Sequence, residues 1–134
     1  VRRARHLHQL PGWVVVALGI NDMEEVGTAG LNSRIDRLLA TIGPGHHILW
    51  LEEYSNRSPR TFSSSHMDYA PKVASFNRHL RARAGASTGL TVIPWVRVVE
   101  ARHLHLFDGI HYDRAGYKAR AKAVADALDA RIGA

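Results

Sequence analysis

The sequence lacks cysteine entirely over its 134 residues. This absence excludes disulfide bonds, catalysis by a thiol and zinc sites built on cysteine. Long hydrophobic runs are absent as well, because none approaches the about 20 residues of a membrane-spanning helix. No signal-peptide pattern is present, although a sequence without its own amino terminus would not carry one. The compartment is therefore unknown from the sequence.

Positive charge is in excess but is not gathered in one place. The 18 Lys and Arg residues outnumber the 12 Asp and Glu residues, which gives a net charge of +6 and an isoelectric point near 10.3. The basic residues are scattered, and the densest run is Arg2-Arg3-Ala4-Arg5, so no nucleic-acid partner is expected. With 46% hydrophobic and 22% charged residues, the chain has the composition of a single globular domain, 1–134.

Three short apolar runs alternate with stretches that repeat at helical spacing. The runs predict strands at 13–18, 48–51 and 90–93. The spacing predicts helices at 31–42, 71–84 and 113–132 and the end of a helix at 1–10. The last helix is expected to bury Ala121, Val124, Ala125, Leu128 and Ile132. Loops are expected at 23–30 and 52–68, and 96–106 is expected to cross the top of the sheet. This alternation predicts an α/β fold, with a parallel sheet between helices.

Polar residues follow the first predicted strand directly. The apolar run from Trp13 to Leu18 ends in Gly19-Ile20-Asn21-Asp22. Open parallel sheets keep their sites at the carboxyl ends of their strands, so these polar side chains are candidates for a site. For Asn21 the alternative is a turn residue whose side chain bonds to the local backbone.

A second polar stretch lies just before the last predicted helix, where Asp108 precedes His111 by three residues. At this spacing the carboxylate can accept a hydrogen bond from one ring nitrogen and leave the other free to take a proton from a nucleophile. This is the base half of a hydrolytic triad. The alternative is that Asp108 caps a turn and His111 is an ordinary loop histidine.

Together, Gly19-Ile20-Asn21-Asp22 and Asp108-Gly109-Ile110-His111 resemble the G-x-N-D and D-x-x-H blocks of SGNH (GDSL-type) serine esterases and lipases. The resemblance implies a three-layer αβα sandwich with flavodoxin-like strand order 2-1-3-4-5. It implies that His111 is the general base, that Asp108 orients it and that Asn21 donates to the oxyanion. It further implies that Gly19 bends the backbone, that Asp22 fixes the Asn21 loop, and that the substrate is a small ester of a lipid or an acylated carbohydrate. No cofactor and no metal are implied.

The Gly-Asp-Ser block that carries the serine in this family is absent, and no nucleophile is expected in this chain. Only twelve residues precede Trp13, too few for a strand, a crossover helix and a second strand. The chain is therefore expected to be the carboxyl-terminal part of an SGNH domain without its first two strands. The run 13–18 would then be an exposed apolar edge that favours self-association. Acyl transfer is a close variant of the expected hydrolysis, and a non-catalytic remnant or binding module is the rival hypothesis.

Three other patterns in the sequence offer alternatives to this hypothesis. Gly85-Ala86-Ser87-Thr88-Gly89 matches the G-x-S-x-G elbow, but it lies between a predicted helix and a following strand, so a plain turn is expected. Ala-Arg-His-Leu-His occurs at 4–8 and again at 101–105, without the third ligand that a metal site needs. The loop 54–66 is either a substrate lid or a solvated insertion, and the insertion is favoured.

Overall fold

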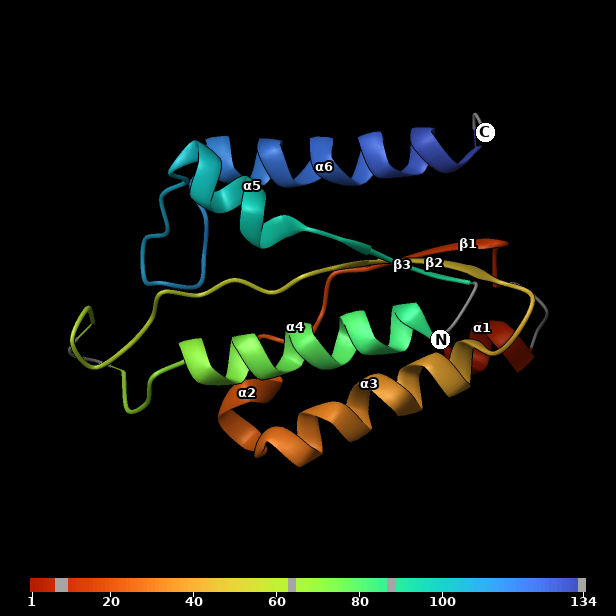
Figure 1. Ribbon diagram of the computed structural model, residues 1–134, viewed down its shortest axis with the longest axis horizontal. Helices are drawn as coiled ribbons and strands as arrows, with labels where there is room; N and C mark the ends of the chain where they lie inside the picture. Colours follow the sequence, from red (N-terminus) through yellow and green to blue (C-terminus); the bar gives the residue numbers. More distant parts are fainter. Residues whose placement is uncertain (7–9, 63–64, 87–88, 133–134) are drawn as a thin grey trace.

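The computed structural model describes residues 1–6, 10–62, 65–86 and 89–132. Three parallel strands, β1 (Trp13–Val16), β2 (His47–Leu51) and β3 (Leu90–Ile93), form one sheet in the order β1-β2-β3. One helix layer contains α1 (Arg2–His6), α2 (Asp22–Glu25), α3 (Thr28–Ile42) and α4 (Ala70–Gly85), and the opposite layer contains α5 (Trp95–Arg102) and α6 (Arg114–Ile132) (Figure 1). The predicted α/β fold and the three-layer arrangement are confirmed.

The central strand β2 is apolar on both faces because helices cover both of them. Ile48 and Trp50 face the cluster beneath α3 and α4, whereas Leu49 and Leu51 face the cluster beneath α5 and α6. All four side chains are buried. This alternation explains why the strand reads in the sequence as an uninterrupted apolar run.

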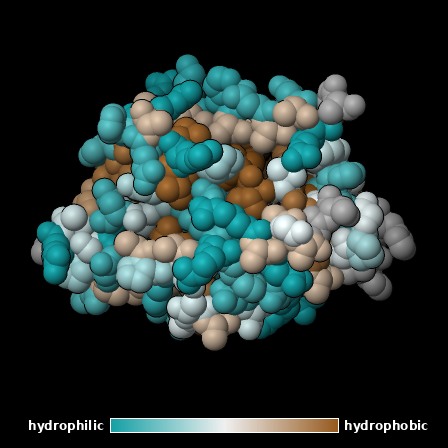
Figure 2. Space-filling model, viewed as in Figure 1, coloured by the Kyte–Doolittle hydropathy of each residue, from teal (hydrophilic) through white to brown (hydrophobic). Residues whose placement is uncertain are grey.

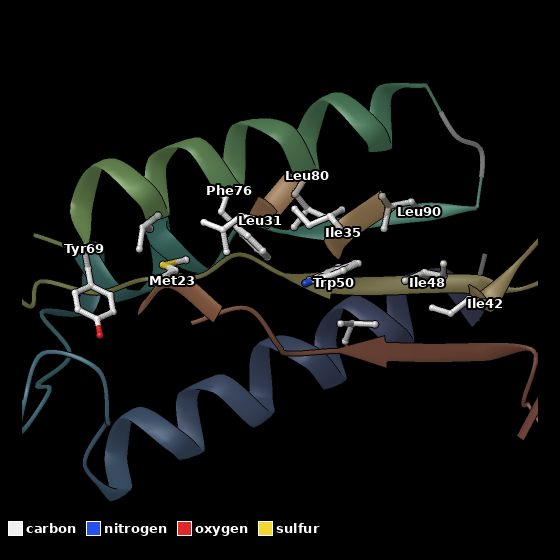
Figure 3. Packing of buried hydrophobic residues seen from close by; sticks show 12 residues of the cluster. Met23, Leu31, Ile35, Ile42, Ile48, Trp50, Tyr69, Phe76, Leu80 and Leu90 are labelled. Carbon is white, nitrogen blue, oxygen red and sulfur yellow. The ribbon is translucent and has the colours of Figure 1, made fainter. Parts of the chain in front are cut away.

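The larger cluster lies between the sheet and the α3–α4 layer (Figure 3). Trp50 of β2 meets Phe76 of α4 edge to face, with ring centroids 6.2 Å apart. The indole N–H of Trp50 donates to the carbonyl of Leu18 at 3.3 Å. In the smaller cluster the Trp95 indole N–H donates to the Tyr112 hydroxyl at 2.9 Å. Both buried indoles therefore have a hydrogen-bond partner, as buried tryptophans require.

Strand β1 is an edge of the sheet within the described residues, since it pairs there with β2 alone. Val15 is 45% exposed and Leu18, just past the strand, is 65% exposed. Figure 2 shows hydrophobic surface in a band at the level of the sheet, between the α6 layer and the α3–α4 layer. The predicted apolar edge is present, whereas self-association through it stays a prediction.

Two predicted connections are wrong. The segment 23–30 is not a loop: α2 covers 22–25 and α3 already begins at Thr28, so Leu31 donates its amide to the Gly27 carbonyl at 3.0 Å. The segment 96–106 does not simply cross the sheet, because α5 fills most of it and buries Trp95 and Val99 one turn apart. Short helices such as these carry too few turns for a clear periodic signal.

The predicted buried face of α6 is partly wrong. Ala121, Ala125 and Ile132 are exposed, and Ile132 is 61% exposed. The face that packs on the sheet consists instead of Gly116, Ala119, Ala123, Val124, Ala127 and Leu128. The close approach of Gly116 to Tyr112 sets this rotation, because a Cβ on Gly116 would lie 2.7 Å from the Tyr112 Cβ.

Most other boundaries agree with the predictions to within a few residues. The first strand stops at Val16 rather than Leu18, and Pro71 lies in the first turn of α4 as expected. The candidate elbow, 85–89, lies between the end of α4 and the start of β3, and its residues Ser87 and Thr88 lie outside the described residues, so the predicted turn stays a prediction. Residues 7 and 8 of the first His-x-His motif also lie outside them. In the part of the chain that is described, no helix has the length and apolarity to cross a membrane.

Candidate active site

Two loops meet at the carboxyl end of the sheet, at the left of Figure 1. The loop after β2 approaches the loop before α6, where the Ser55 hydroxyl donates to the Gly109 carbonyl at 2.6 Å and the Asn56 amide donates to the same carbonyl at 3.2 Å. Gly109 has φ +80°, and a Cβ there would lie 2.7 Å from the Arg57 Cα. Glycine is therefore required at 109, and the described start of the 54–66 loop is packed rather than solvated, since Ser55 is buried.

The loop before α6 closes on itself as a tight turn. Leu106 and Tyr112 form an antiparallel bridge, and the Phe107 amide donates to the His111 carbonyl at 2.8 Å. At the end of the turn, the Asp113 carboxylate accepts the Gly116 amide at 2.7 Å and caps α6, as predicted. The turn thus holds Asp108 and His111 between the bridge on one side and the cap of α6 on the other.

Asp108 and His111 are hydrogen-bonded to each other. The Asp108 Oδ2 lies 2.9 Å from the His111 Nδ1, and the Asp108 Oδ1 accepts the amides of Ile110 at 3.0 Å and of His111 at 2.8 Å. Partial burial favours a higher pKa for Asp108, but the bonds from the backbone and ring of His111 and from the Ile110 amide outweigh it and lower the pKa to about 2. Because the carboxylate is ionised, Nδ1 must be the donor, and Nε2 makes no hydrogen bond within the described chain.

Arg57 supports the same carboxylate from the neighbouring loop. Its Nη1 donates to the Asp108 carbonyl at 3.1 Å and lies 3.8 Å from the Asp108 Oδ2. The sequence does not predict Arg57 as a site residue, because a solvated insertion is the favoured expectation for its loop. No local signal distinguishes Arg57 from the other arginines in that loop.

The segment after β1 bends sharply at Gly19. Gly19 has φ +146°, and a Cβ there would lie 2.6 Å from the Phe76 ring, so no other residue fits. The Gly19 carbonyl accepts the Asp22 amide at 3.1 Å, and the Asp22 carboxylate pairs with Arg34 of α3. These contacts fix both ends of the bend that carries Asn21.

Asn21 and His111 line one cavity of about 180 Å³. Asn21 precedes α2, but its side chain makes no capping hydrogen bond there, so it is not held by the local backbone. The structure therefore brings Asn21 and His111 to one cavity, and Asp108 is bonded to His111, whereas Gly19 and Asp22 are not among the described residues that line the cavity. No serine is among the described residues that line this cavity.

Glu53 lines the same cavity and was not predicted. It continues the alternation of Leu49 and Leu51 toward the α6 face and is only 5% exposed. Burial raises the pKa of Glu53 to about 7, although the charge of Arg120 opposes this shift. The sequence does contain a signal for Glu53. It follows Leu49 and Leu51 at the two-residue spacing of side chains on one face of a strand, so its carboxylate falls on the same face as buried leucines.

A metal centre is not indicated. No group of three His, Asp or Glu side chains within the described ranges could hold a metal ion. The second His-x-His motif ends in His103 and His105, both exposed.

No protein-family model matches the sequence. No curated protein matches it either.

Solved structures do resemble the chain. The catalytic domain of peptidoglycan O-acetyltransferase A from Streptococcus pneumoniae aligns with a TM-score of 0.74 at 20% identity, over 96% of this chain and 69% of that one. A structure described as a platelet activating factor from Streptococcus pneumoniae gives 0.72 at 18% identity, over 87% and 59%. The acetylxylan esterase Axe2 from Geobacillus stearothermophilus gives 0.59 at 16% identity, over 91% and 63%.

The chain has an SGNH-like α/β fold. It spans only 59% of the structure described as a platelet activating factor and 69% of the O-acetyltransferase domain. At these identities the likeness establishes the SGNH-like fold alone, and it does not transfer an activity.

Proposed function

We propose that this chain carries the base and part of the oxyanion hole of a serine-dependent ester hydrolase. The observation that carries the proposal is the 2.9 Å contact between His111 Nδ1 and Asp108, whose histidine lines one cavity with Asn21. An imidazole oriented by an ionised carboxylate is the general base that activates a serine hydroxyl. The fold of the structural neighbours supports the same reading.

In this mechanism each residue has one task. His111 Nε2 takes the proton from the serine hydroxyl as its oxygen attacks the ester carbonyl, and then returns that proton to the leaving alcohol. Asp108 holds the tautomer and stabilises the imidazolium that forms. The Asn21 amide donates to the oxyanion, a contribution worth about 100 to 1,000-fold in rate.

The nucleophile is proposed to come from a segment upstream of Val1 that carries a Gly-Asp-Ser block. Two observations support this: no serine lines the described cavity, and β1 offers an open edge to a further parallel strand. The chain would then be the carboxyl-terminal part of the complete domain and inactive alone.

The acyl group can leave to water or to an alcohol, because both compete for the same acyl-enzyme. Hydrolysis and acyl transfer therefore need the same residues of this chain. The structural neighbours include an O-acetyltransferase and an acetylxylan esterase, and a small-molecule ester is the substrate class that we propose here. The rival function is a non-catalytic remnant that keeps the scaffold and its polar cavity.

The test is intact-mass spectrometry after treatment with a fluorophosphonate, which labels activated serines. It compares the 134-residue chain with a longer protein that adds the residues encoded upstream of Val1. We expect an adduct on an upstream serine of the longer protein, lost in His111→Ala and kept in His105→Ala, an exposed histidine of the same loop. No adduct on the longer protein would favour the remnant, and an adduct on the short chain would mean an internal nucleophile.

A further inference from the structure

Arg57 lies in a loop segment whose backbone is fixed on both sides. Its amide donates to the hydroxyl oxygen of Ser55 at 3.1 Å, and its carbonyl accepts the amide of Tyr69 at 3.0 Å. Both partners are buried. The Arg57 Cα also lies against Gly109, where an added Cβ would approach it to 2.7 Å. The loop after β2 therefore holds Arg57 directly against the turn that carries the candidate base.

The side chain of Arg57 extends along this turn to Asp108. Its Nη1 donates to the Asp108 carbonyl at 3.1 Å and lies 3.8 Å from the Asp108 Oδ2. The Arg57 side chain is only 16% exposed, whereas the Asp108 side chain is 41% exposed. A guanidinium does not lose its proton in proteins, so this positive charge is permanent. It lies beside a carboxylate that water can reach.

The two oxygens of the Asp108 carboxylate have different partners. Oδ1 accepts the backbone amides of Ile110 and His111, whereas Oδ2 accepts the ring of His111 at 2.9 Å. Oδ2 is also the oxygen that the Arg57 guanidinium approaches. The guanidinium therefore attracts the oxygen that must stay in line with the ring, and it opposes the rotation of that oxygen toward water.

The ring of His111 depends on this carboxylate for the position of its own proton. The His111 side chain is 65% exposed, so the rest of the protein encloses little of the ring. In a neutral imidazole, the hydrogen bond at one nitrogen decides which nitrogen carries the proton. Only the tautomer with its proton on Nδ1 leaves Nε2 ready to accept one. The tautomer of His111 therefore depends on how firmly the Asp108 Oδ2 is held.

We infer that Arg57 is a positioning residue for the candidate base. Its guanidinium holds the Asp108 carboxylate toward His111 and so keeps the ring in the Nδ1–H tautomer. Arg57 is not among the described residues that line the cavity with His111, and it acts through Asp108. The catalytic use of this tautomer rests on the proposed function. The tautomer itself needs no nucleophile, so the 134-residue chain can be tested.

The test is ¹⁵N NMR of the histidine rings under mildly alkaline conditions, where the imidazole is neutral. A protonated and an unprotonated ring nitrogen resonate at different frequencies, so the spectrum gives the ratio of the two tautomers. His111→Gln identifies the His111 signals among those of the nine histidines. In the wild type we expect the Nδ1–H form to exceed the Nε2–H form at least about tenfold, because its hydrogen bond is to a charged group.

Arg57→Met removes the charge and keeps an unbranched stem. We expect the ratio of Nδ1–H to Nε2–H to fall about three- to fivefold in this variant. Arg57→Lys keeps a positive charge on a similar stem and should restore the ratio to within about twofold of the wild type. Arg60→Met is the matched control, because Arg60 is exposed in the same loop. It should leave the ratio unchanged.

The three tryptophan indole signals show whether each variant is folded. If Arg57→Met did not fold, Arg57→Gln would give the same comparison, because it also lacks the charge and retains a donor. This readout separates a positioning role from a structural one. A merely structural arginine would change the stability of the chain and leave the tautomer ratio of the folded molecules as it is.

Three outcomes would overturn the inference. An unchanged ratio in folded Arg57→Met would mean that the turn alone fixes the carboxylate. An equal fall in Arg57→Lys would assign the effect to packing of the stem, and an equal fall in Arg60→Met would assign it to the net charge of the loop. Serine labelling in the longer protein with a tautomer independent of Arg57 would overturn this inference alone. A tautomer that depends on Arg57 without any labelled serine would overturn the hydrolase proposal alone.

Discussion

Gly19→Ala tests the bend that connects the sheet to the candidate site. The substitution places a Cβ 2.6 Å from the Phe76 ring at a residue with φ +146°. A residue forced into such a backbone conformation costs about 1 to 3 kcal/mol. Overpacking against a buried ring costs about 1 to 3 kcal/mol more. Together we expect a loss of about 2 to 6 kcal/mol, a large share of the about 5 to 15 kcal/mol that stabilises a typical domain.

Urea unfolding followed by circular dichroism measures this loss by linear extrapolation. Gly12→Ala is the matched control, because no atom lies within 4 Å of a Cβ built there. It should change the free energy of unfolding by no more than about 0.5 kcal/mol.

A double-mutant cycle with Phe76→Leu separates the two causes. The smaller side chain removes ring atoms that the new Cβ would meet, so the double variant should recover about 1 to 3 kcal/mol relative to additivity. The strained backbone would account for the remainder. If Gly19→Ala matched Gly12→Ala, or if the cycle showed no coupling, the reasoning about this bend would be refuted.

Three further predictions concern Glu53, the cap of α6 and the sheet edge. Because burial raises the pKa of Glu53 to about 7 from its ordinary 4.5, the unfolded chain releases this proton at lower pH than the folded one. The free energy of unfolding should therefore fall as the pH rises from about 4.5 to 7, by at most about 3 kcal/mol. A pH series of melts should show this fall in the wild type and not in Glu53→Met, and identical profiles would contradict the assignment. Asp113→Ala removes the cap that Gly116 uses and should cost about 1 kcal/mol in urea unfolding, whereas Asp129→Ala, exposed in the last turns of α6, should cost nothing. Val15→Lys puts a charge on the exposed edge strand and should reduce self-association in sedimentation velocity; an unchanged distribution would place any association elsewhere.

Local patterns in the sequence were sufficient to predict where the strands lie. Apolar runs bounded by glycine and proline fixed β2 and β3 nearly to the residue. The error at β1 has a tertiary cause: beyond Val16 the Leu18 carbonyl accepts the Trp50 indole instead of continuing the ladder. No periodic pattern in the sequence predicts that hydrogen bond.

Helix faces and short helices were less predictable. Alanine is so frequent in α6 that several of its faces look equally apolar, and the packing of Gly116 on Tyr112 decides among them. Helix α5 depends on Trp95 and Val99 packing into the second cluster. The contacts of α5 join residues that are distant in sequence, whereas Gly116 packs on a residue only four positions before it.

Part of the candidate site was likewise predictable from the sequence, and part of it was not. The sequence by itself predicted that Asp108 can pair with His111, because a spacing of three residues in a turn lets the carboxylate reach the imidazole, and the structure contains this contact. The catalytic roles of this pair and of Asn21 stay predictions. Only the tertiary structure brought Asn21 beside His111 and set Glu53 opposite Arg120, because these residues come from separate strands, loops and helices whose meeting depends on the packing of the whole sheet.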